Sequence, residues 1–444
     1  MIASHRHTAK TAKNSFLVYD LFMPDPAESS VLSFEDARRV VEEHAAKVSL
    51  PSIEAVDLLA AAGRVLAEEI FADRDIPPFP RSTRDGYAVR SSDLANLPAT
   101  LDVIGEIKAG EKSEKIPTRI DLGQTVSIMT GAPVPAGADS VVMVEYTTRH
   151  ADRVEITRST TPGENIVPRG AEAGQGTRLL ERGTRLNEAA IALAASAGKS
   201  RLQVYARPRI AVLSTGDEIV DITATPGPTQ IRNSNSYSLA VQILRAGGQP
   251  ILLPIAPDEP QRLRELIEEG MRYDLLLMTG GVSMGRYDLV EQVLAELGAE
   301  IFFTGAKIQP GRPVVFGRYG AGAPAREKAT EMLTCFFGLP GNPVSTMVTF
   351  ELFARPMIEA LSGQLPRKLV FLHAKLKSEI RVRTGLRRFL PANLSGEFEN
   401  SEVDLVTWQG SGDVAATARA DCYIVIPPDR ERIPAGEWVA VLMR

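Results

Sequence analysis

The stretch DLLLMTGGVSMGRYD, residues 274–288, decides the fold class. An acidic residue is followed by four large apolar residues, a threonine and two glycines, which predicts a short buried strand that ends in a glycine-rich loop. The next residues, DLVEQVLAELG at 288–298, carry apolar residues at helical spacing. The order is strand, loop and helix, and the loop is suited to binding a ligand.

The same rhythm repeats over residues 207–362 and predicts a doubly wound α/β domain with a parallel sheet. RPRIAVLSTGDE at 207–218 and PILLPI at 250–255 have the pattern of buried strands. The last segment, at 342–361, has the pattern of a helix with Asn342 as N-cap and Pro343 in its first turn.

The rest of the chain predicts a multidomain protein with further, different blocks. Residues 1–30 are expected to be a disordered tail. Residues 31–75 and 160–206 are expected to form a helical and extended domain, with Ser33 capping a helix and 53–70 forming a helix or a helix-to-strand segment. Short strand patterns at 76–159 predict a small inserted β-domain, and those at 368–444 a small β-barrel or sandwich.

Composition excludes several classes of function. Fifty basic and 55 acidic residues give a net charge of −5, so nothing general attracts nucleic acid or an anionic membrane. No apolar run approaches the ~20 residues of a membrane helix. Cys335 and Cys422 are the only cysteines, which excludes a disulfide framework and is typical of a reducing cytoplasm. The basic start also leaves an organelle transit peptide open.

Three loops are expected at the carboxyl ends of the strands, where a doubly wound sheet binds its ligands. They are STGDE at 214–218, TGGVSMGRYD at 279–288 and FGLPGNPVST at 337–346. Glycines let a backbone approach a phosphate, hydroxyls add donors, and carboxylates hold a hard cation. The pattern favours a phosphate ester bound with magnesium. The residues expected to contact the phosphate are Ser214, Thr215, Gly216, Gly280, Gly281 and Ser283.

Catalysis is expected to depend on carboxylates, cations and a metal. The chain has no GxGxxG fingerprint, no GxxxxGK[ST] loop and no HExxH helix. Arg312, in KIQPGRPVVFG at 307–317, follows a Pro-Gly turn just before a strand. Beside an anion-binding loop it is a candidate ligand of an oxyanion, since a guanidinium matches two oxygens at once.

In order along residues 31–444, these motifs resemble those of the molybdopterin molybdotransferases, namely bacterial MoeA and the E domain of gephyrin. The matching motifs include PPFPRSTRDGYAV (77–89), IMTGAPVPAGADSVVMVE (128–145), SNSYSL (234–239), QPGRPVVFG (309–317), GLPGNPVSTMVTF (338–350) and GSGDVAATARAD (410–421), together with the opening stretch. The resemblance implies a four-part chain whose third part, the α/β domain, is similar to the MogA-type molybdopterin adenylyltransferases.

The resemblance also implies an activity and partners. The activity is Mg²⁺-dependent insertion of molybdate into adenylated molybdopterin, with release of AMP, in molybdenum cofactor biosynthesis. The active protein is expected to be a cytoplasmic homodimer whose protomers share the active site. Molybdopterin adenylyltransferase and molybdoenzymes are the expected partners, and no nucleic acid or membrane is expected.

By motif, the resemblance assigns roles to single residues. Those tied to activity are Asp85, Thr130, Glu172, Glu218, Asp258 and Asp288, of which Glu218, Asp258 and Asp288 are expected to hold Mg²⁺. Molybdate is expected at Arg312, Pro313, Ser345, Arg388 and Ser411. Three positions depart from the family pattern: Gln309 stands for a lysine, Glu172 for an aspartate and Arg84 for a methionine.

Two alternatives stay open. The α/β domain alone would suit the molybdopterin adenylyltransferase reaction. A non-catalytic scaffold or binding protein of the same fold would also fit, because Gln309 and Glu172 alter the site.

Overall fold

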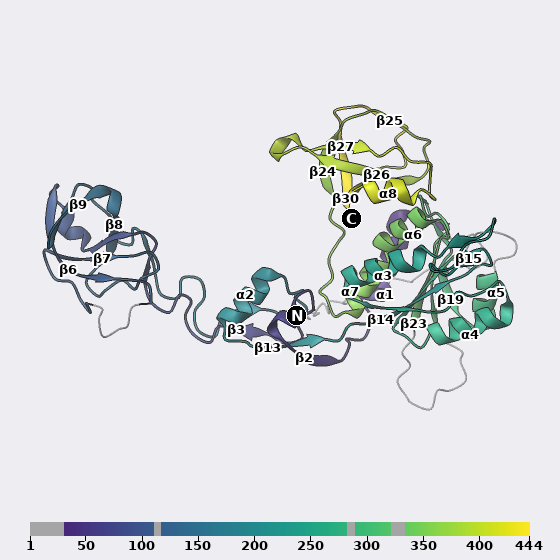
Figure 1. Ribbon diagram of the computed structural model, residues 1–444, viewed down its shortest axis with the longest axis horizontal. Coiled ribbons are helices and arrows are strands. Elements are labelled where there is room, and N and C mark those ends of the chain that lie inside the picture. The colour runs from purple at the N-terminus through teal and green to yellow at the C-terminus, as the bar shows by residue number, and fades with distance from the viewer. Residues whose placement is uncertain (1–30, 111–116, 282–288, 321–333) are drawn as a thin grey trace, which may run out of the picture.

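The computed structural model describes residues 31–110, 117–281, 289–320 and 334–444 of the 444-residue chain. Its blocks follow one another along an extended molecule (Figure 1). A β-domain lies at one end, a smaller mixed block lies in the middle, and the α/β domain lies at the other end with a C-terminal barrel beside it. None of the helices in the described part of the chain has the length and hydropathy needed to cross a membrane.

The middle block is built from two strand pairs and one helix. β2 (Ile53–Asp57) pairs with β13 (Arg201–Tyr205), and β3 (Ile70–Phe71) pairs with β12 (Arg178–Leu180), all antiparallel. η1 (Leu58–Ala61) and α2 (Glu188–Ser196) complete the block. Residues 53–70 do not begin with a helix, as the expected helix or helix-to-strand segment would, because Ile53–Asp57 pairs with β13; long-range pairing outweighs local helical spacing here.

The first helix packs on the α/β domain and not on the middle block. α1 (Phe34–Ala45) begins at Ser33, whose hydroxyl accepts a hydrogen bond from the Asp36 N–H at 3.0 Å, so the predicted N-cap is confirmed. Ala37 and Val41 of α1 are buried in the main core of the α/β domain. β1 (Val31–Leu32) pairs with β20 (Gly305–Ala306) of the same domain. The expected assignment of residues 31–75 to the helical and extended domain stays a prediction.

The inserted β-domain is a six-stranded sheet with the order β8-β5-β7-β6-β10-β9. Its strands and short helices are β4 (Arg81–Ser82), β5 (Gly86–Val89), η2 (Ser91–Leu94), β6 (Ala99–Ile107), β7 (Gln124–Ile128), β8 (Ser140–Met143), η4 (Val144–Tyr146), β9 (Thr147–His150), β10 (Arg153–Ile156) and β11 (Ile166–Val167). Apolar residues from both faces of the sheet form two separate small cores.

The α/β domain is a six-stranded sheet with the order β17-β14-β18-β23-β22-β19. The strands are β14 (Arg209–Ser214), β17 (Gln249–Leu252), β18 (Leu275–Thr279), β19 (Glu300–Phe303), β22 (Val315–Tyr319) and β23 (Thr334–Leu339). The buried strand predicted within residues 274–288 is confirmed as β18, which lies between β14 and β23. β17, β14, β18 and β23 are parallel, whereas β22 and β19 join antiparallel at one edge, so the sheet is mixed there.

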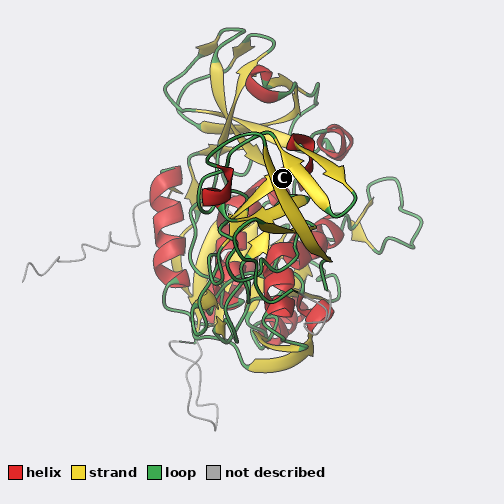
Figure 2. Ribbon diagram, turned by 90° about the vertical axis from the view of Figure 1, so that its left-hand side faces the viewer, coloured by secondary structure: helices red, strands yellow, loops and turns green. Residues whose placement is uncertain are grey.

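Helices cover both faces of this sheet, which makes the fold doubly wound. α3 (Asn235–Ala246), α6 (Pro343–Thr349) and α7 (Arg355–Leu361) contribute to one core with α1, and α4 (Pro260–Gly270) and α5 (Leu289–Glu296) contribute to the other. The orthogonal view in Figure 2 shows helices to either side of the central strands. β15 (Ile219–Val220) and β16 (Ile231–Arg232) form a small parallel pair beside the sheet.

The last helix of the domain is continuous but changes its winding. Asn342 is its N-cap residue and Pro343 lies in its first turn, as predicted, although the Asn342 side chain makes no capping hydrogen bond. A π-helical turn, η5 (Phe350–Ala354), joins α6 to α7.

The C-terminal block is a closed barrel. β24 (Leu372–Leu376), β26 (Arg387–Ser395), β27 (Glu402–Leu405), β28 (Cys422–Ile426) and β30 (Trp438–Met443) close through the β26–β28 pairing. β21 (Ile308–Gln309), from the α/β domain, adds to β26 and links the two blocks. The remaining elements are β25 (Ile380–Arg381), η6 (Phe398–Asn400), α8 (Val414–Arg419) and β29 (Arg432–Ile433).

Candidate active site

Three neighbouring parallel strands end at one level of the sheet. Ser214 of β14 pairs with Thr279 of β18, and Thr279 pairs with Leu339 of β23. Because their carboxyl ends share one edge, the loops that follow meet there. They border a cavity of about 720 Å³ between the α/β domain and the barrel.

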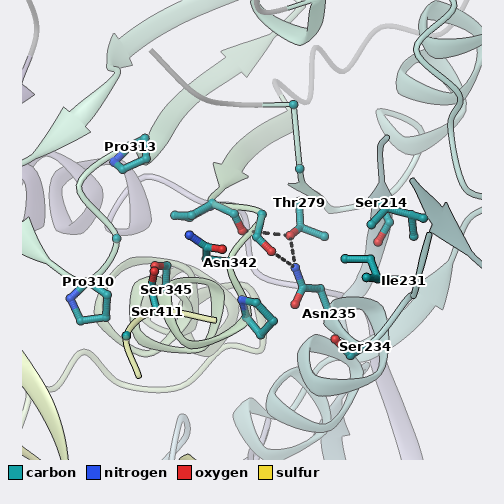
Figure 3. A pocket seen from close by; sticks show the side chains of 18 of the residues that line it. Ser214, Ile231, Ser234, Asn235, Thr279, Pro310, Pro313, Asn342, Ser345 and Ser411 are labelled. Carbon is teal, nitrogen blue, oxygen red and sulfur yellow. Dashed lines mark hydrogen bonds between the residues drawn. The ribbon is translucent and has the colours of Figure 1, made fainter. Parts of the chain in front are cut away.

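The cavity has two walls of different chemistry (Figure 3). One wall carries Ser214 and Asn235, and the opposite wall carries Pro310, Ser345 and Ser411. The structure brings to this cavity many of the residues that the sequence predicted for the site, namely Ser214, Thr215, Glu218, Gly280, Gly281, Arg312, Pro313, Ser345 and Ser411.

The first wall offers hydroxyl groups in two different states. The Ser214 hydroxyl has partners, since it contacts Asn233 Oδ1 at 3.0 Å and Ser236 Oγ at 2.8 Å. The Thr215 hydroxyl has none among the described residues, although Thr215 is only 2% exposed. A buried hydroxyl without a partner is costly, so Thr215 is suited to a polar ligand atom.

Two glycines in this wall allow neighbouring backbone and side-chain atoms to lie where a Cβ would otherwise be. Gly280 has a φ of +91°, and a Cβ there would lie 2.4 Å from the Thr215 carbonyl oxygen. Gly216 has a φ of +133°, and a Cβ there would lie 2.5 Å from Glu218 Oε2. Gly216 thus leaves room for the Glu218 carboxylate to fold over the loop. Gly216 supports the wall in this way without lining the cavity itself.

The second wall combines a helix N-terminus with a cation. Ser345 lies in the first turn of α6, where the helix dipole favours an anion. The Val344 N–H donates to the Ser411 carbonyl at 3.0 Å, which holds the barrel segment against this turn. Arg312 is exposed at the same wall and supplies a positive charge.

Arg388 lies behind this wall and not in it. It pairs across the strands with Gln309, which does line the cavity. Arg388 is 8% exposed, and its Nε has no partner among the described residues. Burial, and then the charge of Arg383, lower the pKa of the Arg388 guanidinium. Arg388 is thus not among the residues that line the cavity, and its expected contact with molybdate stays a prediction.

Three predicted activity residues lie in or next to the inserted β-domain, far from the cavity of the same chain (Figure 1). Asp85 accepts hydrogen bonds from the Thr130 N–H and hydroxyl, and these bonds lower the pKa of the Asp85 carboxyl. Glu172 pairs with Arg81 at 3.1 Å beside the connection to the middle block. One chain alone does not bring these residues to the cavity.

Of the three expected magnesium ligands, the structure describes Glu218 and Asp258. Glu218 lines the cavity. Asp258 lies just outside it, where its N–H donates to Asp217 Oδ1 at 3.0 Å. Asp288 and Ser283 lie outside the described residues. Within the described ranges, no group of three or more His, Cys, Asp or Glu side chains is arranged to hold a metal.

The cavity is also lined by Asn235, Thr279, Asn342 and Trp408, none of which the sequence assigned to the site by itself, although Thr279 and Asn342 lie within two of the predicted loops. Thr279 is the last residue of β18, and its signal in the sequence is a polar residue at the end of a buried strand. Asn235 had only a weak signal, its place at the start of a helix. Trp408 comes from the barrel, and no local pattern connects it to these loops.

Comparison with known proteins covers nearly the whole chain. Family models match at residues 32–198 (MoeA N-terminal region, domain I and II), 211–360 (probable molybdopterin binding domain) and 373–443 (MoeA C-terminal region, domain IV). A molybdopterin molybdenumtransferase of Nostoc sp. is 35% identical over 398 residues, which are 88% of each chain. The chain belongs to the MoeA family. A Bacillus subtilis relative of the same name is 33% identical over 86% of this chain and 87% of its own.

Solved MoeA structures agree with this assignment. A molybdopterin biosynthesis MoeA protein from Pyrococcus horikoshii is 32% identical, covers 93% of this chain and 99% of its own, and has a TM-score of 0.66. A second structure from Pyrococcus horikoshii OT3 is 27% identical, with a TM-score of 0.72. The four-part architecture described above is thus that of the MoeA family.

Proposed function

We propose that this MoeA-family protein acts in molybdenum cofactor biosynthesis by inserting molybdate into adenylated molybdopterin and releasing AMP. The observation that carries the proposal is the pairing of two anion-binding walls across one cavity. One wall has glycines and the Thr215 hydroxyl, which has no partner among the described residues, and the other has Arg312 and the α6 N-terminus. Relatives that match most of the chain carry the name molybdopterin molybdenumtransferase.

The first wall suits the phosphate groups of the adenylated pterin. Gly280 and Gly281 let the backbone come close, and the ligand would give the Thr215 hydroxyl a partner, which none of the described residues supplies. Binding here orients the ligand with its reacting end toward the second wall.

The second wall suits molybdate, which is a tetrahedral dianion. Arg312 offers a planar pair of N–H donors, and Ser345 adds a hydroxyl in the first turn of α6, where the helix dipole favours an anion. These groups hold the oxyanion and stabilise negative charge that develops on it during the reaction.

Magnesium fits the donor chemistry of the first wall. Mg²⁺ is commonly held by one or two carboxylates together with substrate phosphates and water. Glu218 supplies a carboxylate beside the phosphate-binding loops, with Asp258 close by and Asp288 as the third expected ligand. When bound, the ion would neutralise the charge of the phosphates as AMP leaves.

A second copy of the chain would complete the site. Asp85, Thr130 and Glu172 lie too far along the molecule to reach their own cavity, so we propose a homodimer that shares its active sites. Exposed apolar residues on α3, Tyr237, Val241 and Leu244, support a contact surface beside the cavity. We place the dimer in the cytoplasm because both cysteines are unpaired.

The direct test supplies purified protein with adenylated molybdopterin, molybdate and Mg²⁺. The proposal predicts AMP release that depends on both molybdate and Mg²⁺. No AMP with either molybdate or tungstate would contradict it. Consumption of ATP with molybdopterin, in the absence of molybdate, would instead indicate the adenylyltransferase reaction, and ligand binding without either turnover would indicate a scaffold or binding protein.

A further inference from the structure

Asn235, the first residue of α3, ties the two walls of the cavity together. Its Nδ2 donates to Thr279 Oγ1 at 2.9 Å and to the Gly341 carbonyl at 2.8 Å (Figure 3). A carbonyl oxygen can only accept, so the Gly341 contact determines which end of the amide faces these two groups. Both hydrogens of one amide are therefore used in one bridge.

The bridge continues into the second wall through hydroxyl groups. Thr279 Oγ1 donates to the Pro340 carbonyl at 3.1 Å, and the Thr346 hydroxyl of α6 donates to the same carbonyl. Thr279 and Thr346 are both buried. The start of α3, the end of β18 and the turn that leads into α6 are thus held by one buried hydrogen-bond network.

This network fixes the spacing of the two walls. Gly280, which begins the phosphate-binding loop, directly follows Thr279, and Gly341 lies in the turn just before α6 and Ser345. The two loops nearly touch, because a Cβ on Gly341 would lie 3.5 Å from Gly280 Cα. The Asn235 amide holds both loops at this close approach.

We propose that Asn235 is a positioning residue that sets the distance between the bound phosphate ligand and the bound oxyanion. This inference rests on the proposed function of the cavity. Each ligand has its own wall, so loss of the bridge should leave separate binding intact and impair only what requires both walls together. A misplacement of about 1 Å can lower a reaction rate on the order of 100-fold.

The chain offers a matched control on the same helix. Gln242, seven residues further along α3, uses its Nε2 to bridge to the Met347 carbonyl at 3.1 Å and to Glu351 Oε1 at 2.9 Å. Gln242 thus joins α3 to α6 and η5, which follow the turn that Asn235 contacts, but Gln242 does not line the cavity. Asn235→Ala and Gln242→Ala therefore each remove one amide bridge of the same kind, and only the first removes it at the cavity.

The first readout needs no turnover and uses the full chain. The dissociation constant of molybdate is measured with and without saturating AMP. We expect AMP to change the dissociation constant of molybdate at least about fivefold in the wild type and in Gln242→Ala. In Asn235→Ala, AMP should leave this constant unchanged, and the affinity for each ligand alone should stay near that of the wild type. A wild type without this coupling, or an Asn235→Ala variant that keeps it, would overturn the inference.

The second readout is AMP release from adenylated molybdopterin. We expect kcat to fall at least about tenfold in Asn235→Ala with little change in KM, and to stay near wild type in Gln242→Ala. Thr279→Val should behave like Asn235→Ala, and Thr279→Ser should restore the rate because it keeps the hydroxyl. Equal rates in the two alanine variants would refute the positioning role. A wild type that couples the two ligands but releases no AMP would count against the proposed function alone.

Discussion

Asp85 accepts two hydrogen bonds from Thr130, one from the backbone N–H at 2.7 Å and one from the hydroxyl at 2.9 Å. Both residues are exposed, and they lie at the opposite end of the molecule from the cavity. Thr130 lowers the pKa of Asp85 from its usual 3.8, so the carboxylate is ionised at neutral pH. The exposed Asp85 carboxylate, oriented by two hydrogen bonds, is suited to contact a group on another chain.

Mixing two inactive variants tests whether the site is shared. Asp85→Asn removes the charge in the β-domain, and Arg312→Ala removes the cation at the cavity. Each variant alone should release little AMP. If a site takes Asp85 from one protomer and Arg312 from the other, a mixed dimer contains one intact site. Refolding equal amounts together should restore about a quarter of wild-type activity for random pairing. A mixture no more active than its parts would place each site within one chain.

Restoring a lysine at position 309 should strengthen molybdate binding. Gln309 lines the cavity on the same segment as Arg312. Gln309→Lys adds a second cation to the oxyanion wall, and a charged hydrogen bond of about 1.5–3 kcal/mol raises affinity roughly tenfold or more. Isothermal titration with molybdate measures the change. Lys307→Gln, two residues away and outside the cavity wall, serves as the control and should leave the affinity unchanged.

Glu359 should stabilise the end of the α/β domain. It is buried and accepts hydrogen bonds from Arg355 and Arg367, both at 2.9 Å. Burial raises its pKa, but the bonds from Arg367 and Arg355 outweigh burial, so the pKa is lowered from 4.5. Because the folded pKa is depressed, this stabilisation is present above the unfolded pKa and is lost as pH falls through the folded pKa.

Glu359→Gln should therefore lower the free energy of unfolding at pH 7 by about 1–2 kcal/mol, a value kept small because Arg367 is half-exposed. The difference from wild type should shrink below pH 4. Urea unfolding at several pH values measures it. Glu296→Gln breaks an exposed pair with Arg264 and should cost less than about 0.5 kcal/mol. Equal losses in both variants at pH 7 would contradict the role of Glu359.

The two cysteines should react slowly in the native protein. Burial raises the pKa of Cys335 to about 11, and burial together with Asp421 raises that of Cys422 to about 12. At pH 8 both are thiols and not thiolates, so a disulfide reagent should label neither quickly and should label both after unfolding. Above pH ~9 the unfolded thiols ionise while the folded ones do not, so stability should fall as pH rises from 9 to 11. Rapid labelling of the native protein at pH 8 would contradict these shifts.

Most of the α/β domain could be predicted because its signals are local. Residues 275–279 are all buried in β18, as an uninterrupted apolar run indicates. Parallel strands end at one edge, so the loops after Ser214, Thr279 and Leu339 could be placed together from the sequence alone.

The remaining features depend on contacts between distant residues. Ile53–Asp57 becomes a strand only because β13 lies beside it, and the antiparallel β22 is defined by its pairing with β23. Asn235 bridges to Thr279, which is 44 positions further along the chain, and to Gly341, which is 106 positions further along. No local spacing contains such information, and the resemblance named the SNSYSL motif without giving Asn235 a role.

The cavity is proposed to hold adenylated molybdopterin through its phosphates and to bring it into contact with molybdate. The most direct test is to measure, in one reaction of the wild-type protein with adenylated molybdopterin, molybdate and Mg²⁺, the AMP released and the molybdenum bound to the isolated pterin product. We predict one molybdenum for each AMP, with both lost in Arg312→Ala. AMP released without bound molybdenum, or no AMP at all, would contradict the claim.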